Sequence, residues 1–266
     1  MVGIFTSLAL DGGPSPLSVI ALRSGAVGII LAIYLTLVGV PKSLPVRDAA
    51  VTIGIGLVMS INNIALTSAI HRIPVPLAVM LFYIWPALVA IGGAMLGHEK
   101  VSPRTLVGLA LSFVGIALAL QVKFSDAEIV GVLFALLAAV SWTASVLLMG
   151  QFLPRRDSRT YTYWITCTSA AVFITSCLVT ADFASPVSTR GWVGLIGLPI
   201  WYAIGIIGFY VASATIGATK TSFYMNFEPI AAVLLAAMIL GQSLAPIQLL
   251  GAALVVGALF LFRSAH

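Results

Sequence analysis

The sequence predicts an all-α polytopic membrane protein with ten segments in two inverted repeats, the first helix being truncated. Composition, the spacing of apolar blocks and an internal repeat support this prediction. Of the 266 residues, 61% are hydrophobic and only 8% are charged, whereas an ordinary globular domain carries about 25% charged residues. A soluble fold could not cover its surface with so few charges, so we expect the chain to lie in a bilayer.

Nine apolar blocks are long enough to cross a hydrocarbon core of ~30 Å, which takes about 20 helical residues. In order along the chain they cover residues 16–38, 49–70, 74–96, 103–121, 129–150, 160–181, 191–211, 217–240 and 245–262. A tenth block, 1–10, is about half as long. Turn-forming stretches rich in Gly, Pro and charges separate the blocks, at 12–14, 41–48, 97–103, 123–128, 154–159 and 182–190.

An internal repeat appears when the chain is aligned with itself at an offset of 143 residues. Two proline pairs and two glycine pairs coincide without a gap: Pro86/Pro229, Pro103/Pro246, Gly54/Gly197 and Gly108/Gly251. The repeats cover 1–122 and 128–263 with five helices each. An odd number of helices makes the second repeat enter the membrane upside down, as in many secondary transporters. The same offset places the start of the first helix about fifteen residues before Met1, so that helix is expected to be incomplete.

The distribution of Lys and Arg between alternate loops predicts the orientation, because cytoplasmic loops carry the excess of basic residues. One side receives eight of them: Lys42, Arg47, Lys100, Arg104, Arg155, Arg156, Arg159 and Arg263. The other side receives Arg72, Lys123 and Arg190. We therefore expect a multi-pass protein of the cell inner (plasma) membrane with both termini in the cytoplasm.

Several motifs match one family of membrane proteins. They are Pro16 with Ala21-Leu22-Arg23, Pro86 through Gly97-His98-Glu99 to Pro103 and Gly108, Glu228-Pro229 through Gly241-Gln242 to Gly251, and Trp142 in its helix. With these motifs the chain resembles the drug/metabolite transporter superfamily, specifically the EamA-like transporter family. Gln242 departs from the pattern, since the family usually has a glutamate there, like Glu99 in the first half. The resemblance implies transport, and because many relatives export amino acids or related metabolites, efflux is expected.

Glu228 is the first residue that needs a functional explanation, because a charge at membrane depth is expensive. It lies about eleven residues, or ~16 Å, along the helix that begins near Gly217, close to the bilayer midplane. Thr221 and Tyr224 share its helical face, and Pro229 loosens the preceding turn. Glu228 is expected to bind a substrate amine or a proton. The alternative is a buried carboxyl paired to a neighbouring helix.

Arg23 lies about 10 Å inside the helix that starts at Pro16. It is expected either to bind an anionic group of the cargo or to pair with Glu228. Asn62, near the middle of the block 49–70, is expected either to contact substrate or to form an interhelical hydrogen bond.

Four aromatic residues lie at mid-helix beside prolines, where they could stack on a planar apolar cargo or simply pack. They are Tyr83 and Trp85 before Pro86, and Trp201 and Tyr202 after Pro199.

Other kinds of chemistry find little support. Three scattered histidines without a CxxC motif make no metal constellation, and no GxxxxGK[ST] motif is present, so we expect no cofactor and no ATP-driven transport. Glu228 alone does not provide the paired groups that an enzyme needs, so no enzymatic activity is expected. The basic residues form no stripe, so nucleic acid is not an expected partner.

We therefore expect a transporter that moves small polar or amphipathic metabolites through a midplane cavity by alternating access. Its expected partners are a small-molecule substrate and the lipid bilayer, with proton coupling and a homodimer left open. The alternative is a non-transporting membrane subunit or scaffold of a larger complex.

Overall fold

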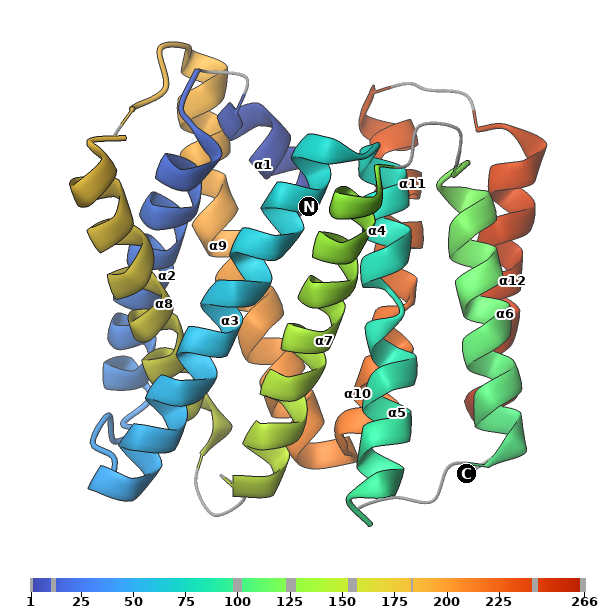
Figure 1. Cartoon of the computed structure of the whole chain (residues 1–266), viewed down its shortest axis with the longest axis horizontal. Coiled ribbons are helices and arrows are strands. Elements are labelled where there is room, and N and C mark those ends of the chain that lie inside the picture. The colour runs from blue at the N-terminus through green and yellow to red at the C-terminus, as the bar shows by residue number, and fades with distance from the viewer. Residues whose placement is uncertain are drawn as a thin grey trace. The chain divides into compact units, whose positions relative to one another are not determined.

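The computed structural model describes residues 2–10, 13–97, 102–122, 128–152, 157–182, 184–240 and 244–263. Within these residues every regular element is an α-helix (Figure 1). The helices are α1 (Val2–Leu10), α2 (Pro16–Leu37), α3 (Val46–Arg72), α4 (Val75–Phe82), α5 (Trp85–Met95), α6 (Pro103–Ala119), α7 (Ile129–Phe152), α8 (Ser158–Thr180), α9 (Thr189–Ile216), α10 (Ala218–Met225), α11 (Phe227–Leu240) and α12 (Pro246–Arg263).

The all-α polytopic class predicted from the sequence is confirmed. Among the residues that the structure describes, six stretches are long and apolar enough to cross a membrane: Pro16–Leu37, Val46–Arg72, Val75–Met95, Ile129–Phe152, Ser158–Thr180 and Thr189–Ile216. Shorter apolar helices cover Pro103–Ala119 and Pro246–Phe260. When α4 is counted with α5 and α10 with α11, the described part has ten segments, and each lies on one predicted block.

Two helices are longer than predicted. The third helix begins at Val46 rather than near residue 49, and its first turn contains Asp48, whose negative charge is favourable at a helix N-terminus. The helix predicted over 191–211 continues to Ile216. It ends where Gly217 adopts a φ of 91°, a conformation open to glycine but strained for other residues.

Helix starts follow from local hydrogen bonding. The Ser15 side chain accepts a hydrogen bond from the Ser18 backbone N–H at 3.1 Å, and Pro16 is the first residue of α2. The Ser102 side chain likewise accepts from the Thr105 backbone N–H at 3.2 Å, ahead of Pro103. A serine cap followed by proline is the combination that best satisfies a helix N-terminus, because proline lacks the N–H that would be left unbonded.

Two of the predicted blocks are interrupted by a helix break, and each break lies just before a proline of the internal repeat. Pro86 and Pro229 lack an N–H, so they cannot donate to the carbonyls of Phe82 and Met225, four residues earlier. Those residues are the last of α4 and α10. Because both breaks come from the same backbone cause, they recur at the 143-residue offset.

The helices form two compact units, each of which takes segments from both halves of the sequence. Unit 1 contains Met1–Ser60 and Leu148–Thr215, and unit 2 contains Ile61–Leu147 and Ile216–His266. The boundaries between the units fall within α3, within α7 and at the last residue of α9. These units are defined by contacts in space, so the division of the sequence into repeats 1–122 and 128–263 stays a prediction.

In unit 1 the main helix pair is α2 with α8 (Figure 1). The hydroxyl of Ser18, at the start of α2, donates to the Asp182 carbonyl after the end of α8, at 2.7 Å. At the opposite end, the Thr160 hydroxyl and the Trp164 indole N–H donate to the carbonyls of Pro41 and Lys42, at 2.9 and 2.7 Å. The two helices are therefore antiparallel.

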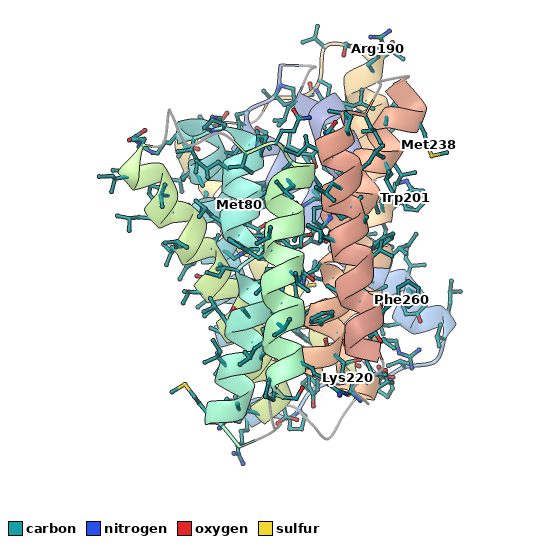
Figure 2. All side chains as sticks on the ribbon, turned by 90° about the vertical axis from the view of Figure 1, so that its right-hand side faces the viewer. Met80, Arg190, Trp201, Lys220, Met238 and Phe260 are labelled. Carbon is teal, nitrogen blue, oxygen red and sulfur yellow. The ribbon has the colours of Figure 1, made fainter. Side chains whose placement is uncertain are left out.

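In unit 2 the main helix pair is α6 with α12, which lie side by side (Figures 1 and 2). A Cβ atom added to Gly115 would lie 2.7 Å from the Gly251 carbonyl oxygen, and one added to Gly251 would lie 2.5 Å from the Ala119 backbone nitrogen. The Gln248 amide also donates to the Ala119 carbonyl at 3.2 Å. Glycine thus permits the backbones of two membrane helices to approach each other directly.

Candidate functional site

The Glu228 carboxyl lies in unit 2, at the break between α10 and α11. Glu228 is the second residue of α11 and the eleventh from Ala218, so it sits near the middle of the segment that α10 and α11 form together. Its side chain is exposed, and its Oε2 atom accepts a hydrogen bond of 2.9 Å from the Tyr83 hydroxyl. In the part of the chain that the structure describes, no Lys, Arg or His lies within ion-pair distance of this carboxyl.

Tyr83 comes from the other helix break, where it follows α4 directly. Its ring belongs to a chain of edge-on aromatic contacts. Phe82 lies 5.8 Å from Tyr83 and 6.2 Å from Trp142, and Trp142 lies 5.9 Å from Trp85, measured between ring centroids. Since Tyr83 is only 8% exposed and Trp85 only 2% exposed, these rings pack against each other within unit 2.

Thr221 and Tyr224 lie on α10, one turn apart. Thr221 is buried, and its hydroxyl donates to the Gly217 carbonyl at 2.9 Å. Tyr224 is 42% exposed, so part of its ring is accessible to lipid, water or a ligand. Of the three residues predicted to share a helical face, Thr221 is therefore buried, whereas Tyr224 and Glu228 are exposed.

Asn62 is buried in α3, and its amide donates to the Ala138 carbonyl of α7 at 2.8 Å. Of the two roles expected for Asn62, this geometry favours the interhelical hydrogen bond.

Arg23 and Tyr202 come together in unit 1. The Arg23 Cζ atom lies 4.3 Å from the centroid of the Tyr202 ring, a cation–π contact between α2 and α9. Trp201, the next candidate on α9, is 38% exposed and points away from the helix (Figure 2). Arg23 and Glu228 belong to different units, so the pairing expected between them stays a prediction.

Sequence reasoning missed two features. It named Tyr83 as a stacking residue but not as the hydrogen-bond partner of Glu228. The available signal was that both residues stand within three positions of a repeated proline. It also passed over Tyr210, which is buried in α9 and whose hydroxyl has no hydrogen-bond partner among the described residues.

The motif residues His98, Glu99 and Gln242 lie outside the described residues. Within the described ranges, no three His, Cys, Asp or Glu side chains gather closely enough to hold a metal ion.

Comparisons with known proteins show which family, relative and solved structure the chain is similar to. The model of the EamA-like transporter family matches residues 1–121 and 129–264. The chain is 23% identical over 255 residues to a protein of Bacillus subtilis (strain 168) named "Uncharacterized transporter YvbV", covering 91% of this chain and 82% of that protein. A protein of known crystal structure matches with a TM-score of 0.81 at 20% identity, over 98% of this chain and 93% of that chain. The likeness in structure extends over the whole fold.

Proposed function

The chain belongs to the EamA-like transporter family, and on this premise we propose that it exports small polar or amphipathic metabolites, such as amino acids or related compounds. The proposed mechanism is alternating access to a cavity near the bilayer midplane. Family membership supports a membrane transporter; the substrate class and the direction are our proposal.

The Glu228 carboxyl is the observation on which the proposal depends. A charged side chain at the centre of a membrane helix costs about 2.5–3.5 kcal/mol on insertion scales, and such residues usually mark substrate or ion pathways. Glu228 is exposed and has only the neutral Tyr83 hydroxyl as a hydrogen-bond partner in the described residues. We infer that the carboxyl binds a proton or an ammonium group of the cargo, either of which would compensate its charge.

The break beside Glu228 supports the same role. Discontinuous helices in corresponding positions of two repeats are typical of substrate sites in secondary transporters, because unwound backbone offers carbonyls to a ligand. Both breaks in this chain precede repeated prolines. The eight-to-three distribution of basic residues further supports an inner-membrane protein with cytoplasmic termini.

The test is the Glu228→Gln variant in cells that express the full chain. Gln keeps the shape of the side chain but removes the charge and the proton site. We expect metabolite resistance and efflux of a labelled amino-acid panel to fall at least about tenfold, since an interaction with a charged group contributes about 1.5–3 kcal/mol. Membrane levels of the variant, measured by immunoblot, are expected to match the parent.

Glu128→Gln is the matched control. Glu128 is exposed at the start of α7, where it pairs with Arg72 at 3.0 Å, and removal of an exposed pair costs little. Efflux by this control should equal that of the parent. A Glu228→Gln protein that inserts normally and exports every compound at the parent rate would overturn the proposed role of the carboxyl.

A further inference from the structure

We propose that Tyr83 is a positioning residue for Glu228: its hydroxyl holds Oε2 and leaves Oε1 as the oxygen that takes up a proton. This inference rests on the proposed function and adds to it a specific site for the proton and a residue that orients it. It follows from the hydrogen bond, the packing of the tyrosine ring and the two helix breaks.

The Tyr83–Glu228 hydrogen bond has a defined direction. A phenol has one O–H donor, and an ionised carboxylate can only accept. The Tyr83 hydroxyl lies 2.9 Å from Oε2 of Glu228. Within the described residues this is the sole hydrogen bond of the carboxyl, so Oε1 is left for another donor.

The Tyr83 ring is held in place by packing. It belongs to an apolar cluster with Met80, one turn earlier on α4, and Ile230 of α11; Figure 2 labels Met80. Phe82 contacts the ring edge-on at 5.8 Å between centroids. Because a packed ring keeps its rotamer, the hydroxyl is preorganised toward the carboxyl and not recruited to it.

The two helix breaks bring these partners together only once. Tyr83 follows α4, and Glu228 is the second residue of α11. At the 143-residue offset, the position equivalent to Tyr83 is Asn226 and the position equivalent to Glu228 is Trp85. Both equivalents are buried, and neither can supply a carboxylate. Of the two equivalent helix breaks, only the one between α10 and α11 therefore carries a carboxyl, and this carboxyl can take up one proton.

Few other charged groups lie on the elements around this pair in unit 2. They are His71 and Arg72 at the end of α3, Arg104 at the start of α6, Glu128 just before α7, Lys220 and Tyr224 on α10, and Arg263 at the end of α12, while α4 and α5 contribute no titratable group. Lys220 precedes Glu228 by eight residues, or about 12 Å of helix. Arg72 pairs with Glu128, and none of the groups whose side chains the structure describes is bonded to Glu228. Tyr83 is thus the group placed to set the proton affinity of the carboxyl.

A hydrogen bond donated to a carboxylate favours its charged form. Replacing Tyr83 with Phe keeps the ring and removes the donor, so the carboxyl should take up its proton at a higher pH. The expected change is about one pH unit or more, from the usual strength of a hydrogen bond to a charged group. If Tyr83 had only a structural role, Tyr83→Phe would change folding but would not shift the pH midpoint of proton uptake by Glu228.

The probe is dicyclohexylcarbodiimide, an apolar carbodiimide that reacts with protonated carboxyls. The purified full chain in liposomes is treated over a pH series, and the adduct on the peptide containing Glu228 is quantified by mass spectrometry. Labelling should rise as pH falls in the parent protein, and Tyr83→Phe should shift its midpoint upward by about one unit. Glu228→Gln should give no adduct at this position.

Tyr210→Phe is the matched control, because it removes another buried hydroxyl, one without a hydrogen-bond partner in the described residues. Its labelling midpoint should equal the parent's. A Tyr83→Phe midpoint equal to the parent's, in protein that still elutes as one sharp peak, would overturn the positioning role. That result leaves the proposed function standing if Glu228→Gln still abolishes efflux. Normal efflux by Glu228→Gln would instead remove the proposed function while leaving a shifted midpoint intact.

Discussion

Asp157 shows how one carboxylate can begin a membrane helix and hold a basic residue beside it. Its side chain accepts from the Arg159 backbone N–H at 2.9 Å and from the Arg159 guanidinium, which also donates to the Tyr34 hydroxyl at 3.3 Å. The hydrogen bond with the Arg159 side chain is the largest cause that lowers the pKa of Asp157 below its usual value. A lowered pKa stabilises the folded state while the carboxyl is ionised, and that stabilisation is lost as pH falls through the folded-state pKa.

The prediction at this residue is that Asp157→Ala lowers the free energy of unfolding by about 0.5–2 kcal/mol at neutral pH, the usual cost of losing an N-cap. The thermal unfolding of detergent-solubilised protein should show this difference at neutral pH. The difference should shrink below about pH 4, where the parent carboxyl begins to protonate. Asp157→Asn keeps an acceptor for the cap and should recover most of the loss; an Asn variant as unstable as the Ala variant would contradict the capping role.

At this same scale, the candidate site shows what one sequence can reveal. Glu228 stood out because an acid in an apolar block needs an explanation. Its partner did not, because Tyr83 is 145 residues away in sequence, and apolar patterning does not specify which aromatic of a neighbouring helix lies opposite. Similarly, Asn62 could be placed at mid-helix, but the Ala138 carbonyl that it bonds could not be identified.

The helices themselves were more predictable than their contacts. Proline and glycine mark the ends of the apolar blocks, and Pro229 predicts a loosened turn where α10 ends and α11 begins. The split of 74–96 into α4 and α5 was not predicted, although Pro86 offered the same signal. Continuous hydropathy hides such a break, because Tyr83 and Ile84, which form the turn between α4 and α5, are themselves largely apolar.

The α6–α12 pair yields a prediction about packing between elements. Gly115→Ala should destabilise the protein by about 1–3 kcal/mol, since a Cβ atom would lie 2.7 Å from the Gly251 carbonyl oxygen and 2.8 Å from a Val255 methyl. Gly257→Ala on α12 is the matched control, because a Cβ atom there meets nothing within 4 Å. The test compares the fraction of each protein that stays monodisperse after heating in detergent. Equal stability of the two variants would show that the contact between α6 and α12 accommodates the added methyl group without loss of stability.

Across the whole molecule, the orientation in the membrane is the prediction that can be tested most directly. A fluorescent reporter fused after His266 should be active in the cytoplasm, and a cysteine at Arg156 should resist a membrane-impermeant label applied from outside. A cysteine at Arg190 should accept that label, because the basic count places this loop outside. Labelling of position 156 but not 190 would reverse the orientation.

The antiparallel pairs α2–α8 and α6–α12 determine the order in which this protein can be assembled during synthesis. Gly115 leaves the ribosome 136 residues before its packing partner Gly251, which at about 5–20 residues per second is a delay on the order of ten seconds. During that interval the glycine face of α6 lacks its partner helix, and unit 1 also lacks α9 until that helix is synthesised. Neither unit is therefore fully packed until late in synthesis, and insertion chaperones and membrane proteases would encounter the nascent chain in this partly folded state.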